Sequence, residues 1–128
     1  MKSYFSSATS KTPKIILDKE KEQFLISGRS LPEDVREFYY PVFDWFHAYF
    51  KDPNKSTNLI FEISYYNTAS SKIFLDLLFI LKDYLDMGNM VRVTWRYEKE
   101  DEEVLEAGED LMRVSKMPMY FEEVDFID

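Results

Sequence analysis

The sequence lacks cysteine altogether and has one histidine and three glycines among 128 residues. Without cysteine the chain has no disulfide, thiolate nucleophile or zinc–thiolate site. The only histidine, His47, stands among aromatic residues with no catalytic partner evident, so we expect it to be structural. Gly28, Gly88 and Gly108 are too widely spaced to form a phosphate-binding loop. We therefore expect a protein that is not an enzyme and holds neither cofactor nor metal.

Long apolar runs are also missing. The first residues contain no apolar segment of the length that a signal peptide needs. The most apolar stretch, residues 73–85, is interrupted by Asp76, Lys82 and Asp83, and it is shorter than the roughly 20 residues that cross a bilayer. These features predict a soluble, cytoplasmic protein that does not associate with membranes.

Positive charge is in deficit, since 24 Asp and Glu against 16 Lys and Arg leave a net charge of −8. An acidic chain without a basic patch repels nucleic acid, so a charged partner is expected to present a basic face. Glu and Asp are densest in residues 98–110. Their spacing does not match a calcium loop, and a helix with a solvated acidic face is favoured over a metal site.

Apolar residues, in contrast, make up 45% of the chain and aromatic residues 17%, enough for one domain over residues 1–128. Four tyrosines, Tyr39, Tyr40, Tyr65 and Tyr66, suit either the core or an interface, and core packing is favoured. Apolar periodicity predicts the elements in turn. They are a strand hairpin over 14–17 and 23–27, a helix over 32–51, a strand over 59–66, a helix over 70–86, a strand over 91–97, a helix within 98–116 and a strand over 119–126.

This order, ββαβαβαβ, predicts an α/β (α+β) fold in which helices cover mainly one face of a mixed sheet. Ser30 has capping-box spacing to Glu33 and is expected to start the first helix. Pro41 lies inside that helix, where we expect a kink or a short helix followed by a longer one. Gly88 is placed to end the second helix.

The most informative segment joins the third predicted strand to the second helix, where Asn67 is followed by Thr68, Ala69, Ser70 and Ser71. Asn, Thr and Ser cap helices because their side-chain oxygens accept hydrogen bonds from unpaired backbone N–H groups. Capping is the favoured interpretation of these residues. The alternative is phosphorylation, because the positive end of the helix dipole tolerates a phosphoryl group.

Five pieces of the chain, in order, resemble the SiaC family of bacterial regulatory phosphoproteins, which are related in fold to STAS domains of anti-sigma-factor antagonists. They are Thr9–Pro13 with Leu17 and Asp18, Gly28–Glu33, Phe38–Val42 with Trp45, Tyr66–Lys72, and Leu105–Asp110. The resemblance implies a STAS-like sheet and a non-enzymatic switch protein. It also accounts for Pro41 inside a helix and for Gly108 inside the acidic segment.

In such proteins a dedicated Ser/Thr kinase phosphorylates a threonine at the strand-to-helix turn, and a PP2C-like phosphatase reverses the modification. The unmodified form binds and activates a diguanylate cyclase, which makes cyclic di-GMP. Carried onto this chain, the resemblance implies Thr68 as the phosphorylation site. Tyr66, Asn67, Ser70, Ser71 and Lys72 then form the surrounding shell that caps the helix and contacts the partner.

Two other functions stay open. The chain could switch regulators of sigma factors instead of a cyclase, as related proteins do, or it could be a constitutive scaffold in which the hydroxyl-rich turn only caps a helix. A small-ligand-binding or hydrolytic domain would need a pocket that His47 and the scattered glycines give no reason to expect.

Overall fold

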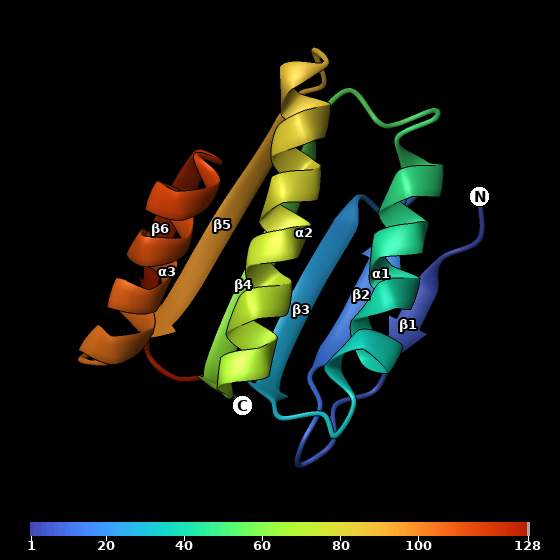
Figure 1. Cartoon of the computed structure of the whole chain (residues 1–128). Coiled ribbons are helices and arrows are strands. Elements are labelled where there is room, and N and C mark those ends of the chain that lie inside the picture. Colours follow the sequence, from blue (N-terminus) through green and yellow to red (C-terminus); the bar gives the residue numbers. More distant parts are fainter. Residues whose placement is uncertain (128) are drawn as a thin grey trace.

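The computed structural model describes residues 1–127, in which three strands are followed by three helices that alternate with three further strands (Figure 1). The elements are β1 (Tyr4–Ser6), β2 (Lys14–Asp18), β3 (Gln23–Ser30), α1 (Val35–Tyr49), β4 (Thr57–Tyr66), α2 (Thr68–Asp86), β5 (Val91–Glu98), α3 (Glu102–Ser115) and β6 (Met119–Val124). No helix within the described residues is long and apolar enough to span a membrane.

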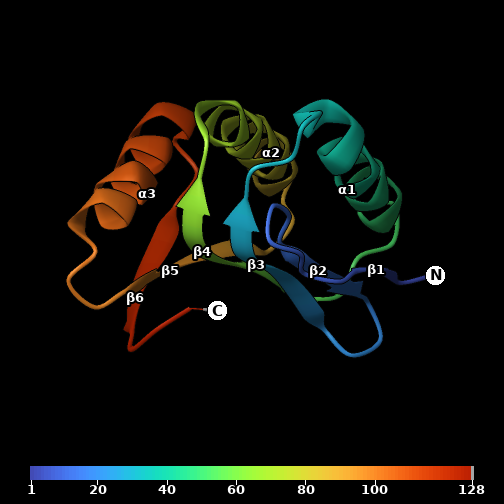
Figure 2. The ribbon, with the colours of Figure 1, turned by 90° about the horizontal axis from the view of Figure 1, so that it is seen from below.

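The six strands form one mixed sheet in the order of the chain. β1, β2 and β3 pair antiparallel, whereas β3, β4, β5 and β6 pair parallel. Each parallel pair is joined through a helix, and right-handed crossovers between successive neighbours carry every helix to the same side. Figure 2 shows α1, α2 and α3 side by side over one face of the sheet. The predicted mixed sheet covered on one face is confirmed.

Three details differ from the sequence-based expectation. The edge strand β1 was not predicted, because three residues are too few to show a periodicity. Ser30 ends β3 instead of starting a helix, and Asp34 caps α1 by accepting a hydrogen bond from the Glu37 N–H at 3.1 Å. α1 also continues through Pro41 as a single helix, so a division into two helices is wrong.

The core lies between the helices and the sheet face that they cover. Alternate residues of the central strands point into it, and Phe74 of α2 packs edge-on against both Tyr39 and Phe61. Tyr39 and Trp95 are among the largest fully buried side chains. Burial of this aromatic surface is the main stabilising contribution to the fold.

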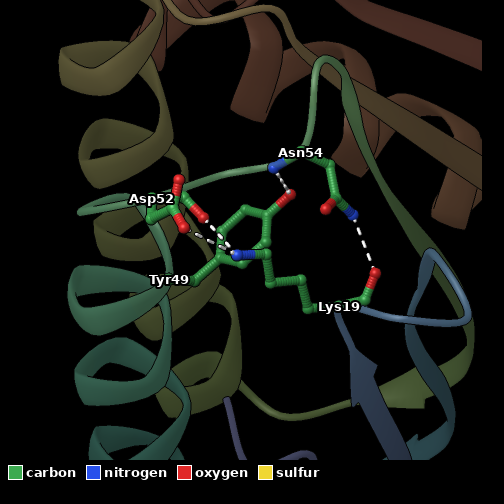
Figure 3. A network of polar contacts seen from close by, with 4 residues as sticks. All are labelled: Lys19, Tyr49, Asp52 and Asn54. Atoms are coloured by element: carbon green, nitrogen blue, oxygen red, sulfur yellow. Dashed lines mark hydrogen bonds and ion pairs between the residues drawn. The ribbon is translucent and has the colours of Figure 1, made fainter.

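A polar network closes the end of the molecule where β4 begins (Figure 3). Lys19 donates to the backbone carbonyl of Asp52 at 2.6 Å, and the Asn54 side chain donates to the carbonyl of Lys19 at 2.9 Å. The Asn54 N–H donates to the Tyr49 hydroxyl, which also pairs with Thr57. These contacts tie the β2–β3 turn to the α1–β4 loop, far from the end of β4 where α2 begins.

Candidate functional site

The segment singled out in the sequence lies where β4 ends and α2 begins, at the carboxyl end of a parallel strand. Asn67 is the N-cap of α2, with extended backbone angles, and its side-chain oxygen accepts a hydrogen bond from the Ser70 N–H at 2.8 Å. The Asn67 N–H donates to the carbonyl of Ser30 at 3.1 Å and so anchors the cap to β3. Capping is therefore the role of Asn67, and Thr68 is the first residue of the helix.

The three hydroxyl residues of the segment have different environments. Thr68 is exposed, Ser71 is half-buried and Ser70 is fully buried. In the described chain no side-chain hydrogen bond uses the Thr68 hydroxyl, whereas Ser70 makes several. Lys72 is exposed one turn further along α2, and Tyr66 is half-buried just before the cap. Of the three residues, Thr68 is the most exposed.

A chain of buried hydroxyl groups lies directly beneath this helix start. The Tyr39 hydroxyl pairs with the Ser30 hydroxyl at 2.6 Å, the Ser30 hydroxyl donates to Ser70 at 2.8 Å, and the Ser70 hydroxyl donates to the Ser30 carbonyl at 2.9 Å. Burial raises the pKa of the Tyr39 phenol well above its ordinary value, so it stays protonated. Each hydroxyl therefore donates to the next group in the row. These hydrogen bonds connect α1, β3 and α2.

Sequence reasoning missed this arrangement, because it assigned Ser30 to a helix cap and left Tyr39 as a general aromatic core residue. Both side chains are completely buried. The hydroxyl of Ser70, predicted to belong to the shell around Thr68, points into this interior chain and holds the first turn of α2 from below. The parallel register of β3 and β4 and the packing of α1, which the sequence does not reveal, bring the three hydroxyls together.

We expect Ser70→Ala to lower the free energy of unfolding by about 1–3 kcal/mol, because it leaves the buried Ser30 hydroxyl without its acceptor. Ser71→Ala is the matched control, since Ser71 is half-buried and takes no part in the row of buried hydroxyl groups. It is expected to change stability by less than about 0.5 kcal/mol. Urea unfolding of both variants measures the difference, and equal stabilities would show that the hydroxyl chain contributes nothing.

Carboxylates at and near α3 act on Tyr66, the residue that precedes the Asn67 cap. The pKa of the Tyr66 phenol is raised by burial and, to a lesser extent, by the negative charges of Asp101, Glu103 and Asp110. Across residues 1–127, no cluster of three or more His, Asp or Glu side chains could hold a metal ion. A negative charge at the start of α2 would be supported by the N-terminal dipole of that helix.

The remaining aromatic candidates divide between the core and the surface. Tyr39 is buried and Tyr66 half-buried, whereas Tyr40 and Tyr65 are exposed, with Tyr65 beside the Arg29 guanidinium. His47 is exposed, and its Nδ1 hydrogen-bonds the Tyr84 hydroxyl at 2.7 Å. That contact joins α1 to α2 at the surface.

Fold and site together define a class of protein, a mixed-sheet α/β domain that presents an exposed threonine at the start of its central helix. The family model of the SiaC family of regulatory phosphoproteins matches residues 6–124. The chain therefore belongs to the SiaC family, and the resemblance identified in the sequence is confirmed.

Relatives from Pseudomonas aeruginosa agree with this assignment. An uncharacterized protein of strain UCBPP-PA14 is 29% identical over 110 residues, which cover 86% of this chain and 87% of the relative. The crystal structure of apo-SiaC is 26% identical, covers 95% of this chain and 99% of its own, and superposes with a TM-score of 0.85. A matching chain in the structure of diguanylate cyclase SiaD in complex with its activator SiaC is 26% identical, covers 94% and 99%, and has a TM-score of 0.87.

Proposed function

We propose that this chain is a non-enzymatic, cytoplasmic switch whose unphosphorylated form binds and activates a diguanylate cyclase, and that phosphorylation of Thr68 ends the interaction. A Ser/Thr kinase adds the phosphate and a PP2C-like phosphatase removes it. The observation that carries the proposal is that Asn67 caps α2, while Thr68 is exposed and its hydroxyl makes no side-chain hydrogen bond within the described residues.

Physical chemistry supports a phosphate at this position. The first N–H groups of a helix lack intrahelical acceptors and attract anions, so a phosphoryl group of about −1.5 to −2 charge is tolerated within the isolated chain. At an interface the same group must be desolvated on a chain that already carries a net charge of −8. The modification is therefore compatible with the fold and unfavourable for a complex that covers α2.

Membership of the SiaC family and the complex that SiaC of P. aeruginosa forms with SiaD support a cyclase as the partner. A switch acting on sigma-factor regulators would use the same threonine, and a constitutive scaffold would use none. The exposed position of Thr68 favours a modification over the scaffold.

Intact-mass analysis of the chain purified from its native cells, followed by mapping of the modified residue, tests the modification. We expect a singly phosphorylated form in some growth condition, with the phosphate on Thr68, and we expect Thr68→Ala to eliminate it. Ser71→Ala serves as the control and is expected to retain the phosphorylated form. A phosphate that maps to another residue, or no phosphorylated form in any growth condition, would overturn the assignment of Thr68.

A further inference from the structure

A surface cavity of about 500 Å³ lies where α2 ends and β5 begins, at the amino ends of the parallel strands β4 and β5. Figure 1 shows that α2 extends along the length of the sheet. Leu85, which lines the cavity, is 17 residues from Thr68 on this helix, or about 26 Å at 1.5 Å per residue. The cavity is therefore remote from the candidate site at the start of α2.

The cavity combines an apolar wall with one cation. Leu85, Met90 and Pro118 form the wall, and Arg92 is the cation beside it. The guanidinium carbon of Arg92 lies 3.8 Å from the centre of the Tyr120 ring, so the two groups are stacked. Such stacking holds a guanidinium in a fixed plane, and its planar set of N–H groups matches the two oxygens of a carboxylate. Within residues 1–127, Arg92 forms no ion pair that would occupy these N–H groups.

Negative charge is missing from the lining of this cavity. None of its described lining residues is Asp or Glu, whereas four other surface cavities of the protein each contain at least one. Asp86, next to Leu85 in the chain, is paired with Lys82. The backbone N–H groups of Gly88 and Asn89 donate to the last carbonyl groups of α2. An anion at Arg92 therefore meets less opposing charge than at those other cavities of this acidic chain.

Asn58 provides a second hydrogen-bond donor beside Arg92. The two residues face each other in the register of β4 and β5, so their side chains are neighbours on one face of the sheet. The side-chain oxygen of Asn58 accepts a hydrogen bond from the Thr94 hydroxyl at 3.0 Å, which orients the amide. Its NH₂ group has no partner among the described residues, and Asn58 lines the cavity. The amide and the guanidinium can thus donate to the same anion.

We propose that this cavity binds a small organic carboxylate with an apolar body. The carboxylate accepts hydrogen bonds from Arg92 and Asn58, and the body packs on Leu85, Met90 and Pro118. A carboxylate without a body would leave the apolar wall in water, and an uncharged molecule would leave Arg92 without a counter-charge. The inference goes beyond the proposed function and does not depend on it, because no part of the cavity belongs to the start of α2.

The test is a nuclear magnetic resonance titration of the isotopically labelled full chain with three probes. Naphthoate has both the charge and the apolar body, naphthamide has the body without the charge, and acetate has the charge without the body. We expect naphthoate to bind with a Kd of about 1 mM or lower, and the other two probes to bind at least about tenfold more weakly. The amide signals that shift are expected to be those of residues 56–58, 90–92 and 119–120.

Two pairs of variants separate the cavity from the general charge of the chain. Met90→Glu places a carboxylate in the cavity and is expected to weaken naphthoate binding at least about tenfold. Met87→Glu is its control, because Met87 is 74% exposed on the same connection and does not line the cavity; a change of less than about twofold is expected. Arg92→Gln is expected to weaken naphthoate binding about tenfold and to leave naphthamide binding unchanged. Arg36→Gln, which removes an exposed arginine of α1, is expected to change neither affinity.

Equal affinities for naphthoate and naphthamide, no binding of naphthoate, or shifted signals confined to other parts of the chain would overturn the carboxylate site. Naphthoate binding that survives both Arg92→Gln and Met90→Glu would do the same. None of these results bears on the proposed function, which depends on phosphorylation of Thr68 and its effect on partner binding. Conversely, a chain that is never phosphorylated on Thr68 would leave the carboxylate site unaffected.

Discussion

Thr68→Asp is expected to weaken binding to the partner cyclase by about a hundredfold or more, whereas Thr68→Ala binds like the unmodified protein. The carboxylate introduces a negative charge that the partner must desolvate, on a chain whose net charge is already −8. The methyl side chain of alanine adds no charge and leaves the Asn67 cap intact. Isothermal titration calorimetry with the purified partner measures both affinities.

Asp76→Asn is a useful charge control in this experiment, since it alters a carboxylate of α2 two turns from Thr68. Asp76→Asn is expected to weaken the affinity for the partner by tenfold or less, which is typical of a charge change at the rim of an interface. Circular dichroism should show all three variants folded, because each changed residue is exposed. If Thr68→Asp and Thr68→Ala bound with the same affinity while both were folded, Thr68 would not be a switch.

Gly108→Ala is expected to lower the free energy of unfolding by about 3 kcal/mol, the upper range for overpacking a core. A Cβ at this position would lie 2.5 Å from Cδ1 and 2.6 Å from Nε1 of Trp95. Trp95 cannot move aside readily, because it is 1% exposed and its Nε1 donates to the Val104 carbonyl at 2.9 Å. Denaturant unfolding measures the loss.

Glu109→Ala, at the adjacent exposed position of α3, is the matched control. Alanine is the best helix former, so this variant is expected to be as stable as the parent within about 0.5 kcal/mol. Because alanine also favours the helix at position 108, any loss there reports the contact with Trp95. A Gly108→Ala protein as stable as the parent would show that α3 does not pack this closely on β5.

Much of the fold could be predicted from the sequence, because the apolar periods of residues 59–66, 73–85 and 91–97 are long and regular. The Gly88 helix end was also correct, since Gly88 has a φ of +105° and its N–H bonds back to Leu85. Short or context-dependent features were not predictable. Tertiary burial of Tyr39 and Val42 keeps α1 continuous through Pro41, where local preference alone predicts a break.

The candidate site was predictable in its location and not in its internal division of roles. The local sequence leaves Thr68, Ser70 and Ser71 as equivalent hydroxyls, since a helix shift of one residue changes which of them faces the core, and only the family resemblance singles out Thr68. The structure separates them, because the cap at Asn67 sets the helix phase and turns Ser70 toward Ser30.

The most direct test of the switch compares one protein in two states. The chain phosphorylated on Thr68 and the same sample after treatment with a PP2C-type phosphatase are each used as bait in a native-cell extract. We predict that the treated sample captures a diguanylate cyclase and raises its cyclic di-GMP synthesis, while the phosphorylated sample does neither. Capture and activation of the cyclase to the same extent by both samples would contradict the account.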